Sequence, residues 1–219
     1  MIRAMFLREL TVMLRRPAFT AAVALHAGVL AWFMLTWREG MPHLAGANVY
    51  EQQHLVQWAV LAWLFPWAVA RLVPIERGDA LARLAARMGV APSQIVTGRV
   101  LAIGVSLALI VLSAMPVALL AQQMSAIPLA VVVRDLAPVG GFLLLSAPVT
   151  LACVLLCRDR LAGWLAATAS CVALLAFAHA AGLSGVAATA ACAGAGFSAT
   201  VALGARANAS WRYEQEHPS

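Results

Sequence analysis

Residues 74–93 read PIERGDALARLAARMGVAPS and form the longest charged interval in an otherwise apolar chain, between two segments that are each long enough to cross a bilayer. Helical spacing of i, i+3, i+4 and i+7 gathers the apolar residues on one stripe, namely Leu81, Leu84, Ala85 and Met88. The opposite face is charged and consists of Glu76, Asp79, Arg83 and Arg87. Gly89 is placed to end this helix. We therefore expect a short helix at the membrane surface that can dock a soluble partner.

The bulk composition is that of a polytopic membrane protein. The chain has 219 residues, of which 63% are hydrophobic and 11% are charged, and its mean hydropathy is +0.86. A soluble domain is closer to about half apolar and about a quarter charged. We expect an all-α integral membrane protein. The formal charge of +6 does not indicate nucleic-acid binding, because the charged residues lie at the ends of apolar segments rather than on one folded face.

Apolar segments of the length that crosses a bilayer predict six transmembrane helices. They cover approximately residues 18–37, 55–73, 95–120, 135–156, 161–181 and 186–203. Pro66 and Pro116 are expected to bend the second and third spans, and residues 129–133 to lie at the interface before the fourth. The chain then divides into an interface helix (1–17), a six-span domain (18–205) with the short charged helix at about 75–90, and a polar tail (206–219).

The first seventeen residues have the pattern of a basic amphipathic helix that Pro17 ends. Its apolar stripe consists of Ile2, Phe6, Leu7, Leu10, Met13 and Leu14, and the charged residues opposite are Arg8, Glu9, Arg15 and Arg16. Such a helix lies in the interface plane, with its apolar face in the acyl boundary and its arginines toward anionic headgroups.

The distribution of arginine orients the chain in the membrane. All fifteen basic residues are arginine, and only Arg38 and Arg134 fall in segments expected outside, which leaves thirteen inside. This asymmetry follows the positive-inside rule and predicts that both termini and the stretch 74–93 are cytoplasmic. The absence of lysine excludes a P-loop, a pyridoxal Schiff base and a protein-kinase site on this chain. Any nucleotide chemistry must therefore come from another chain.

No catalytic constellation or metal motif is found, and we expect the chain not to be an enzyme. Histidines within or near the spans, such as His26 and His179, could relay a proton or ligate a haem iron, or could be hydrogen-bonded structural residues. Tryptophans of the second span could line a path for an apolar or planar substrate, or could form an interfacial belt. The candidate substrate path is His26, Trp58, Trp63, Trp67 and His179.

The order of these elements resembles the permeases of ATP-binding cassette (ABC) transporters of the type-2 exporter class. The resemblance rests on the amphipathic N-terminal helix, six spans, and the cytoplasmic segment from Glu76 to Ala102, which reads E-R-G-x-x-L-x-x-L followed by G-V-x-P-S-x-I-V-x-G-R-V-L-A. The matching positions are Glu76, Gly78, Leu81, Leu84, Pro92, Ile95, Gly98 and Arg99. In size and layout the chain looks most like the B subunit of the haem exporter of cytochrome c maturation.

The resemblance implies a permease subunit that moves a substrate by ATP hydrolysis on a separate ATP-binding cassette subunit. It implies a second permease subunit as homodimer or related heterodimer, a bacterial inner membrane, ATP on the partner, no cofactor on this chain, and haem as a possible cargo. The implied ATPase-coupling residues are Glu76, Arg77, Gly78, Asp79, Leu81, Arg83, Leu84, Arg87 and Met88. The implied interface-helix residues are Phe6, Arg8, Glu9, Leu10, Arg15 and Arg16. The alternative is a non-transport scaffold or receptor subunit that recruits a cytoplasmic partner.

Overall fold

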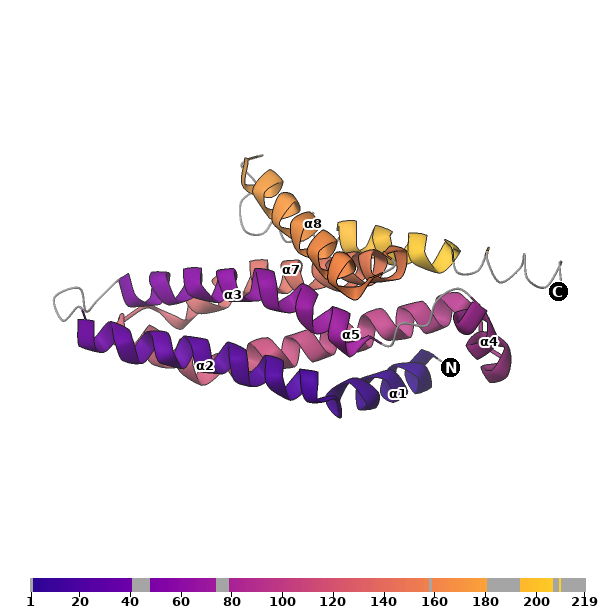
Figure 1. Cartoon of the computed structure of the whole chain (residues 1–219). Coiled ribbons are helices and arrows are strands. Elements are labelled where there is room, and N and C mark those ends of the chain that lie inside the picture. Colours follow the sequence, from indigo (N-terminus) through magenta and orange to yellow (C-terminus); the bar gives the residue numbers. More distant parts are fainter. Residues whose placement is uncertain are drawn as a thin grey trace.

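A computed structural model describes residues 2–40, 48–73, 79–157, 159–180, 194–206 and 209, and throughout these ranges the regular structure is helical, without a strand. The helices are α1 (Ile2–Leu14), α2 (Pro17–Gly40), α3 (Asn48–Leu72), α4 (Asp79–Met88), α5 (Pro92–Ser113), α6 (Met115–Met124), α7 (Leu129–Leu156) and α8 (Arg160–Ala180). Residues 194–206 are also helical. The all-helical prediction is confirmed for the described residues (Figure 1).

Four helices are long and apolar enough to cross a membrane: Pro17–Thr36, Val49–Leu72, Pro92–Ser113 and Leu129–Leu156. The chain is therefore a multi-pass membrane protein, and these helices coincide with the first four expected spans. In α8 the apolar stretch found among the described residues, Leu161–Ala173, is shorter than a span. Of the expected sixth span, only the part from residue 194 onward is described.

Contacts between the helix ends define two ends of the bundle. At one end Arg16 donates a hydrogen bond from Nη1 to the carbonyl oxygen of Arg71 at 3.1 Å, and residue 204 lies against Ser93 at the start of α5. α1 and α4 lie at this same end (Figure 1), which we call the arginine-rich end. At the far end the Tyr50 N–H donates to Ser125 Oγ at 3.2 Å. These contacts show that α2, α3 and α5 each run between the two ends.

The third expected span is interrupted. α5 ends at Ser113, and α6 begins at Met115 with Pro116 in its first turn. Proline has no N–H to continue the helical ladder, so the carbonyls before it need other partners. The Ile110 carbonyl oxygen accepts a hydrogen bond from Ser113 Oγ at 2.6 Å and lies 2.9 Å from His26 Nδ1 on α2. The bend expected at Pro116 is thus a break in the helix two residues earlier, at Ala114.

The fourth expected span begins earlier than the sequence indicated. Residues 129–133, expected as a separate interfacial piece, are the first turns of a continuous α7 that starts at Leu129. The physical reason is local, because Pro128 is the residue before the first turn and its fixed φ of −60° suits a helix start. Pro138 and Pro148 lie inside α7 without ending it.

The main apolar core lies among α2, α3, α5 and α7. Leu61 and Phe65 of α3, Ile103 and Leu107 of α5, and Phe142 of α7 are all fully buried in it. The rings of Phe65 and Phe142 are stacked, with centroids 5.7 Å apart. α5, the helix that follows α4, is therefore packed directly against the other spans.

Candidate coupling surface and substrate path

The N-terminal helix α1 packs along the first half of α5, and this is the most extensive contact between two helices in the described part of the chain. Gly98 permits the close approach, because a Cβ at this position would lie 3.1 Å from Met5 Cβ and 3.4 Å from the Phe6 nitrogen. One residue further, Arg99 Nε lies 3.4 Å from Glu9 Oε2. Both side chains are buried, at 4% and 5% exposure. A buried ion pair therefore joins α1 to α5.

The burial of Glu9 corrects the face assigned to it from the sequence. Glu9 was expected among the exposed arginines, but the buried residues of α1 are Met5, Glu9 and Met13, spaced by four. Ile2 and Leu7 of the expected apolar stripe are exposed instead. The reason is tertiary: a charge inside an apolar helix is costly unless an opposite charge meets it, and Glu9 meets Arg99. The sequence feature that could have predicted the burial of Glu9 is Arg99, because an arginine within an apolar span needs an acidic partner.

The other residues expected on the interface helix take different positions. Phe6 and Leu10 are half-buried and pack against the main core. Arg8 and Arg15 are exposed. Arg8 Nη1 lies 3.9 Å from Glu9 Oε1, and Arg16 is half-buried through its hydrogen bond to the end of α3. α1 thus contacts the bundle along one side and keeps basic groups on the other.

The short helix α4 is attached to the same assembly at its C-terminal end. Gly89 has a φ of +60°, its N–H donates to the Ala86 carbonyl at 3.3 Å, and the Val90 N–H donates to the Ala85 carbonyl at 3.1 Å. These two bonds form a Schellman motif, for which the left-handed conformation favours glycine. The expected end of this helix at Gly89 is confirmed.

An apolar cluster then holds α4 against α1 and α5. Met5, Ala85, Val90 and Ile95 are buried together, and Leu84 and Met88 pack on them half-buried. Arg8 Nη1 of α1 also lies 3.5 Å from Met88 Sδ. The apolar stripe expected from the sequence therefore meets this chain's own surface at the residues where side chains are described. The outward side of that part of α4 consists of the exposed Ala86 and Arg87.

The remaining coupling candidates are only partly described. Glu76, Arg77 and Gly78 lie outside the described residues. Asp79, Leu81 and Arg83 lie on α4, where the backbone alone is described. The described coupling candidates are therefore Leu84, Arg87 and Met88, which the fold brings to the arginine-rich end beside α1.

His26, a candidate for the substrate path, is fully enclosed in the contact between α2 and α5. Its Nδ1 is 2.9 Å from the Ile110 carbonyl oxygen. A carbonyl only accepts hydrogen bonds, so in the neutral ring Nδ1 carries the proton and Nε2 does not. His26 thus binds the carbonyl next to the α5–α6 break, and it has no open surface for a substrate.

The tryptophans make their ring contacts and hydrogen bonds with residues other than His26. Trp58 Nε1 donates to His54 Nε2 at 3.0 Å, and its ring meets Phe142 edge to face at 5.7 Å. Trp63 and Trp67 lie further along α3 and stack on each other at 6.3 Å. The side chain of His179 is outside the described part. The described candidates therefore have three different surroundings. His26 lies between α2 and α5, Trp58 packs on Phe142 in the main core, and Trp63 and Trp67 stack on each other.

A polar group at the far end of the bundle was not predicted. Tyr50 donates from its hydroxyl to Asp135 Oδ2 on α7 at 3.3 Å, and its ring stacks on His54 at 6.0 Å. Gln53 and Gln57 are buried beside them on α3. The sequence contains a pattern that could have predicted this group, since these polar residues recur at three- and four-residue spacing on one face of an apolar helix.

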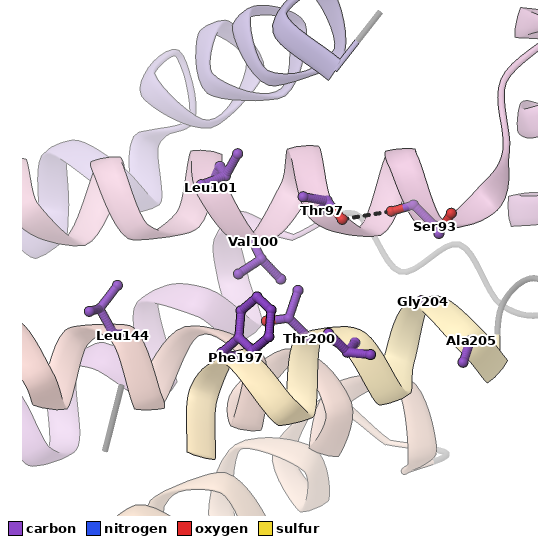
Figure 2. Close-up of a pocket in the computed structure, with 10 residues that line it drawn as sticks. Ser93, Thr97, Val100, Leu101, Leu144, Phe197, Thr200, Gly204 and Ala205 are labelled. Atoms are coloured by element: carbon purple, nitrogen blue, oxygen red, sulfur yellow. Dashed lines mark hydrogen bonds between the residues drawn. The ribbon is translucent and has the colours of Figure 1, made fainter. Parts of the chain in front are cut away.

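A cavity of about 740 Å³ lies between α5, α7 and the helical residues 194–206 (Figure 2). Phe197 and Thr200 face Val100 of α5 across it. Its two threonine hydroxyl groups are turned to their own helices, since Thr97 Oγ1 donates to the Ser93 carbonyl and Thr200 Oγ1 to the Gly196 carbonyl, both at 2.9 Å. The wall is therefore mostly apolar. Sequence reasoning missed this cavity, because its lining residues come from three segments that are distant in sequence.

Gly196 fixes the segment 194–206 against α7. A Cβ at this position would clash with the backbone carbonyl group of Leu144, so only glycine permits this approach.

Within the described residues, no three His, Cys, Asp or Glu side chains gather in a way that could hold a metal ion. No protein-family model, curated protein or solved structure matches this chain.

Proposed function

We propose that this chain is the membrane-spanning permease subunit of an ABC-type transporter, with α4 as the helix that couples it to a separate ATP-binding subunit. One observation carries the proposal: α4 is fixed by its Schellman motif and apolar cluster to α1 and α5, and α1 is fixed to α5 by the buried Glu9–Arg99 pair. A partner that displaces α4 therefore displaces α5 with it.

The route from this assembly into the membrane is short. α5 continues from the α4 contact into the main core, where Ile103 and Leu107 are fully buried against the other spans. Interfaces packed in this way switch between discrete arrangements rather than deform continuously. Nucleotide binding on the partner would thus favour one of two arrangements of the spans, which is the requirement for coupling between distant sites.

The proposal includes six spans, both termini in the cytoplasm of a bacterium, a second permease subunit and export across the inner membrane. The contact of residue 204 with Ser93 supports the topology, because it brings the end of the last helical segment to the arginine-rich end. The apolar cavity supports a cargo with a large apolar surface, and the haem implied by the resemblance is one such molecule.

The test is made on the complex purified from its native membrane and reconstituted in nanodiscs. Arg87→Glu reverses the charge on the outward side of α4 without touching its packed side. We expect it to lower recovery of the ATP-hydrolysing subunit at least tenfold, while Arg206→Glu, an exposed arginine off α4, leaves recovery unchanged. Equal recovery with both variants would contradict the assignment of α4, as would the absence of any ATP-hydrolysing subunit in the wild-type complex.

A second measurement separates transport from recruitment. Phe197→Cys, in a chain whose four native cysteines are replaced by alanine, places a thiol in the cavity for labelling. We expect the labelling rate to change at least threefold on adding ATP, because the spans rearrange. An ATPase-bound complex whose labelling rate is unaffected by ATP would favour the scaffold or receptor alternative.

A further inference from the structure

A second, smaller pocket lies where α3 ends and α8 begins. It has a volume of about 310 Å³ and is lined by Trp63, Trp67, Ala70, Arg71, Asp159, Leu161 and Trp164. Among the described residues, it shares no lining residue with the large cavity and none with the contacts that hold α4. Its lining combines three tryptophans with one residue of each charge.

The tryptophans form a corner with two walls. Trp63 and Trp67, one helical turn apart on α3, are nearly parallel, with an interplanar angle of 11°. Trp164 of α8 stands almost perpendicular to Trp63, at 81° and a centroid distance of 5.9 Å. The face of an indole ring carries negative potential and attracts cations, and tryptophan does so more strongly than the other aromatic residues. The corner therefore favours a positively charged group with an apolar neighbour.

The charged residues of the pocket are opposite in sign, and both are exposed. Arg71 lies in the last turn of α3, and Asp159 in the turn between α7 and α8. Within the described residues, no ion pair joins these two side chains. A guanidinium and a carboxylate on one small pocket complement a ligand that carries both a negative and a positive charge.

The position of the pocket favours one class of ligand of that kind. The candidate spans Val49–Leu72 and Leu129–Leu156 end beside it, so it lies at the boundary of the hydrocarbon layer. Lipid headgroups occupy that level, where tryptophan and arginine side chains are favoured. A volume of about 310 Å³ is at the lower end for small-molecule sites, which suits a headgroup rather than a whole lipid.

We propose that this pocket binds the headgroup of a zwitterionic phospholipid, phosphatidylethanolamine. Arg71 binds the phosphate, and Asp159 accepts hydrogen bonds from the ammonium group, which rests against the tryptophan corner. An anionic lipid such as phosphatidylglycerol supplies only the phosphate charge and leaves Asp159 facing it. Asp159 is thus the residue that selects the lipid. The inference requires only that the chain spans a membrane and is independent of the transport proposal.

The test measures lipid binding by the full-length chain in detergent, using native mass spectrometry with phosphatidylethanolamine or phosphatidylglycerol of the same acyl chains. We expect the wild type to bind phosphatidylethanolamine about tenfold more tightly. Asp159→Asn, a substitution of an exposed residue that keeps its shape, should reduce this preference to about twofold or less. Arg71→Gln should weaken the binding of both lipids. Arg206→Gln and Trp32→Leu, which change exposed residues outside the pocket, should leave both affinities unchanged.

Equal affinity of the wild type for the two lipids would overturn the proposal, as would an unchanged preference in Asp159→Asn. A soluble ligand with the same charges is tested with phosphoethanolamine as a competitor. We expect it to displace lipid only at concentrations at least a hundredfold higher, because it lacks the acyl chains that hold the lipid at the interface. Displacement at equal concentration would show that the occupant is a soluble zwitterion and would also overturn the proposal.

Discussion

The two ends of the bundle are held together by different chemistry. At the arginine-rich end, α1 and α5 are joined by the buried ion pair of Glu9 and Arg99 and by the close approach at Gly98. At the far end, α3 is joined to α7 by the hydrogen bond from Tyr50 to Asp135, in which the donor is uncharged.

This difference teaches which end resists rearrangement. Separating a buried ion pair exposes two charges to an apolar surrounding, and the cost of leaving either one there is large. A hydrogen bond from an uncharged donor contributes less, about 1.5–3 kcal/mol when its acceptor is a carboxylate. We therefore expect the contacts of the arginine-rich end to resist rearrangement more than those of the far end.

The largest expected effect is that of breaking the ion pair. Arg99→Ala leaves the buried Glu9 carboxylate with only the more distant, exposed guanidinium of Arg8, 3.9 Å from Oε1. We therefore expect a loss of about 3 kcal/mol in the free energy of unfolding, the lower end for breaking a buried ion pair. Chemical denaturation in detergent, followed by circular dichroism, measures it. Arg87→Ala removes an exposed arginine from α4 and should cost within about 0.5 kcal/mol. Equal stability of the two variants would mean that the arginine-rich end does not depend on the pair.

The second effect concerns the close approach of α1 to α5. Gly98→Ala places a methyl group 3.1 Å from Met5 Cβ, and we expect α1 to be pushed away at a cost of about 1–3 kcal/mol. Faster hydrogen exchange of the α1 amides would locate the change. Gly140→Ala on α7 has no atom within 4 Å of the added carbon, so it should stabilise the helix by up to about 1 kcal/mol. Destabilisation by both substitutions would point to a general intolerance of alanine instead.

The smallest effect is expected at the far end. Tyr50→Phe removes the hydroxyl that donates to the Asp135 carboxylate, and we expect a cost of about 1.5 kcal/mol, the lower end for a hydrogen bond to a charged group, because the bond is long at 3.3 Å. A double-mutant cycle with Asp135→Asn isolates the contribution of this pair from other changes at the two positions. A coupling energy as large as that between Glu9 and Arg99 would remove the contrast between the two ends.

The elements that depend on local pattern could be predicted from the sequence. Apolar length located the first four spans, because a bilayer demands that length of any helix that crosses it. The end of α4 at Gly89 followed from the residue that tolerates a positive φ. These features need no knowledge of what lies beside them.

The features that were missed are decided by neighbours distant in sequence. The burial of Glu9 depends on Arg99, ninety positions away, and helical periodicity cannot show which side of α1 meets α5. The tryptophan corner needs Trp164 of α8 beside Trp63 of α3. The break at Ala114 depends partly on His26 of α2, whose ring binds a carbonyl freed there. In each case the residues are visible in the sequence, but their proximity is not.

The break at Ala114 has a mechanical consequence. α5 contains 22 residues, so at 1.5 Å per residue it is about 33 Å long. The break at its C-terminal end is the point around which the helix can rotate. A rotation of about 10° around that point would carry Pro92, beside α4, through an arc of about 6 Å, while Ile110, about 6 Å from the break, would move by about 1 Å. His26 binds α5 at Ile110, close to the break, where the displacement of the helix is smallest. The hydrogen bond between His26 and Ile110 can therefore persist while α5 rotates, and α6 need not move with α5.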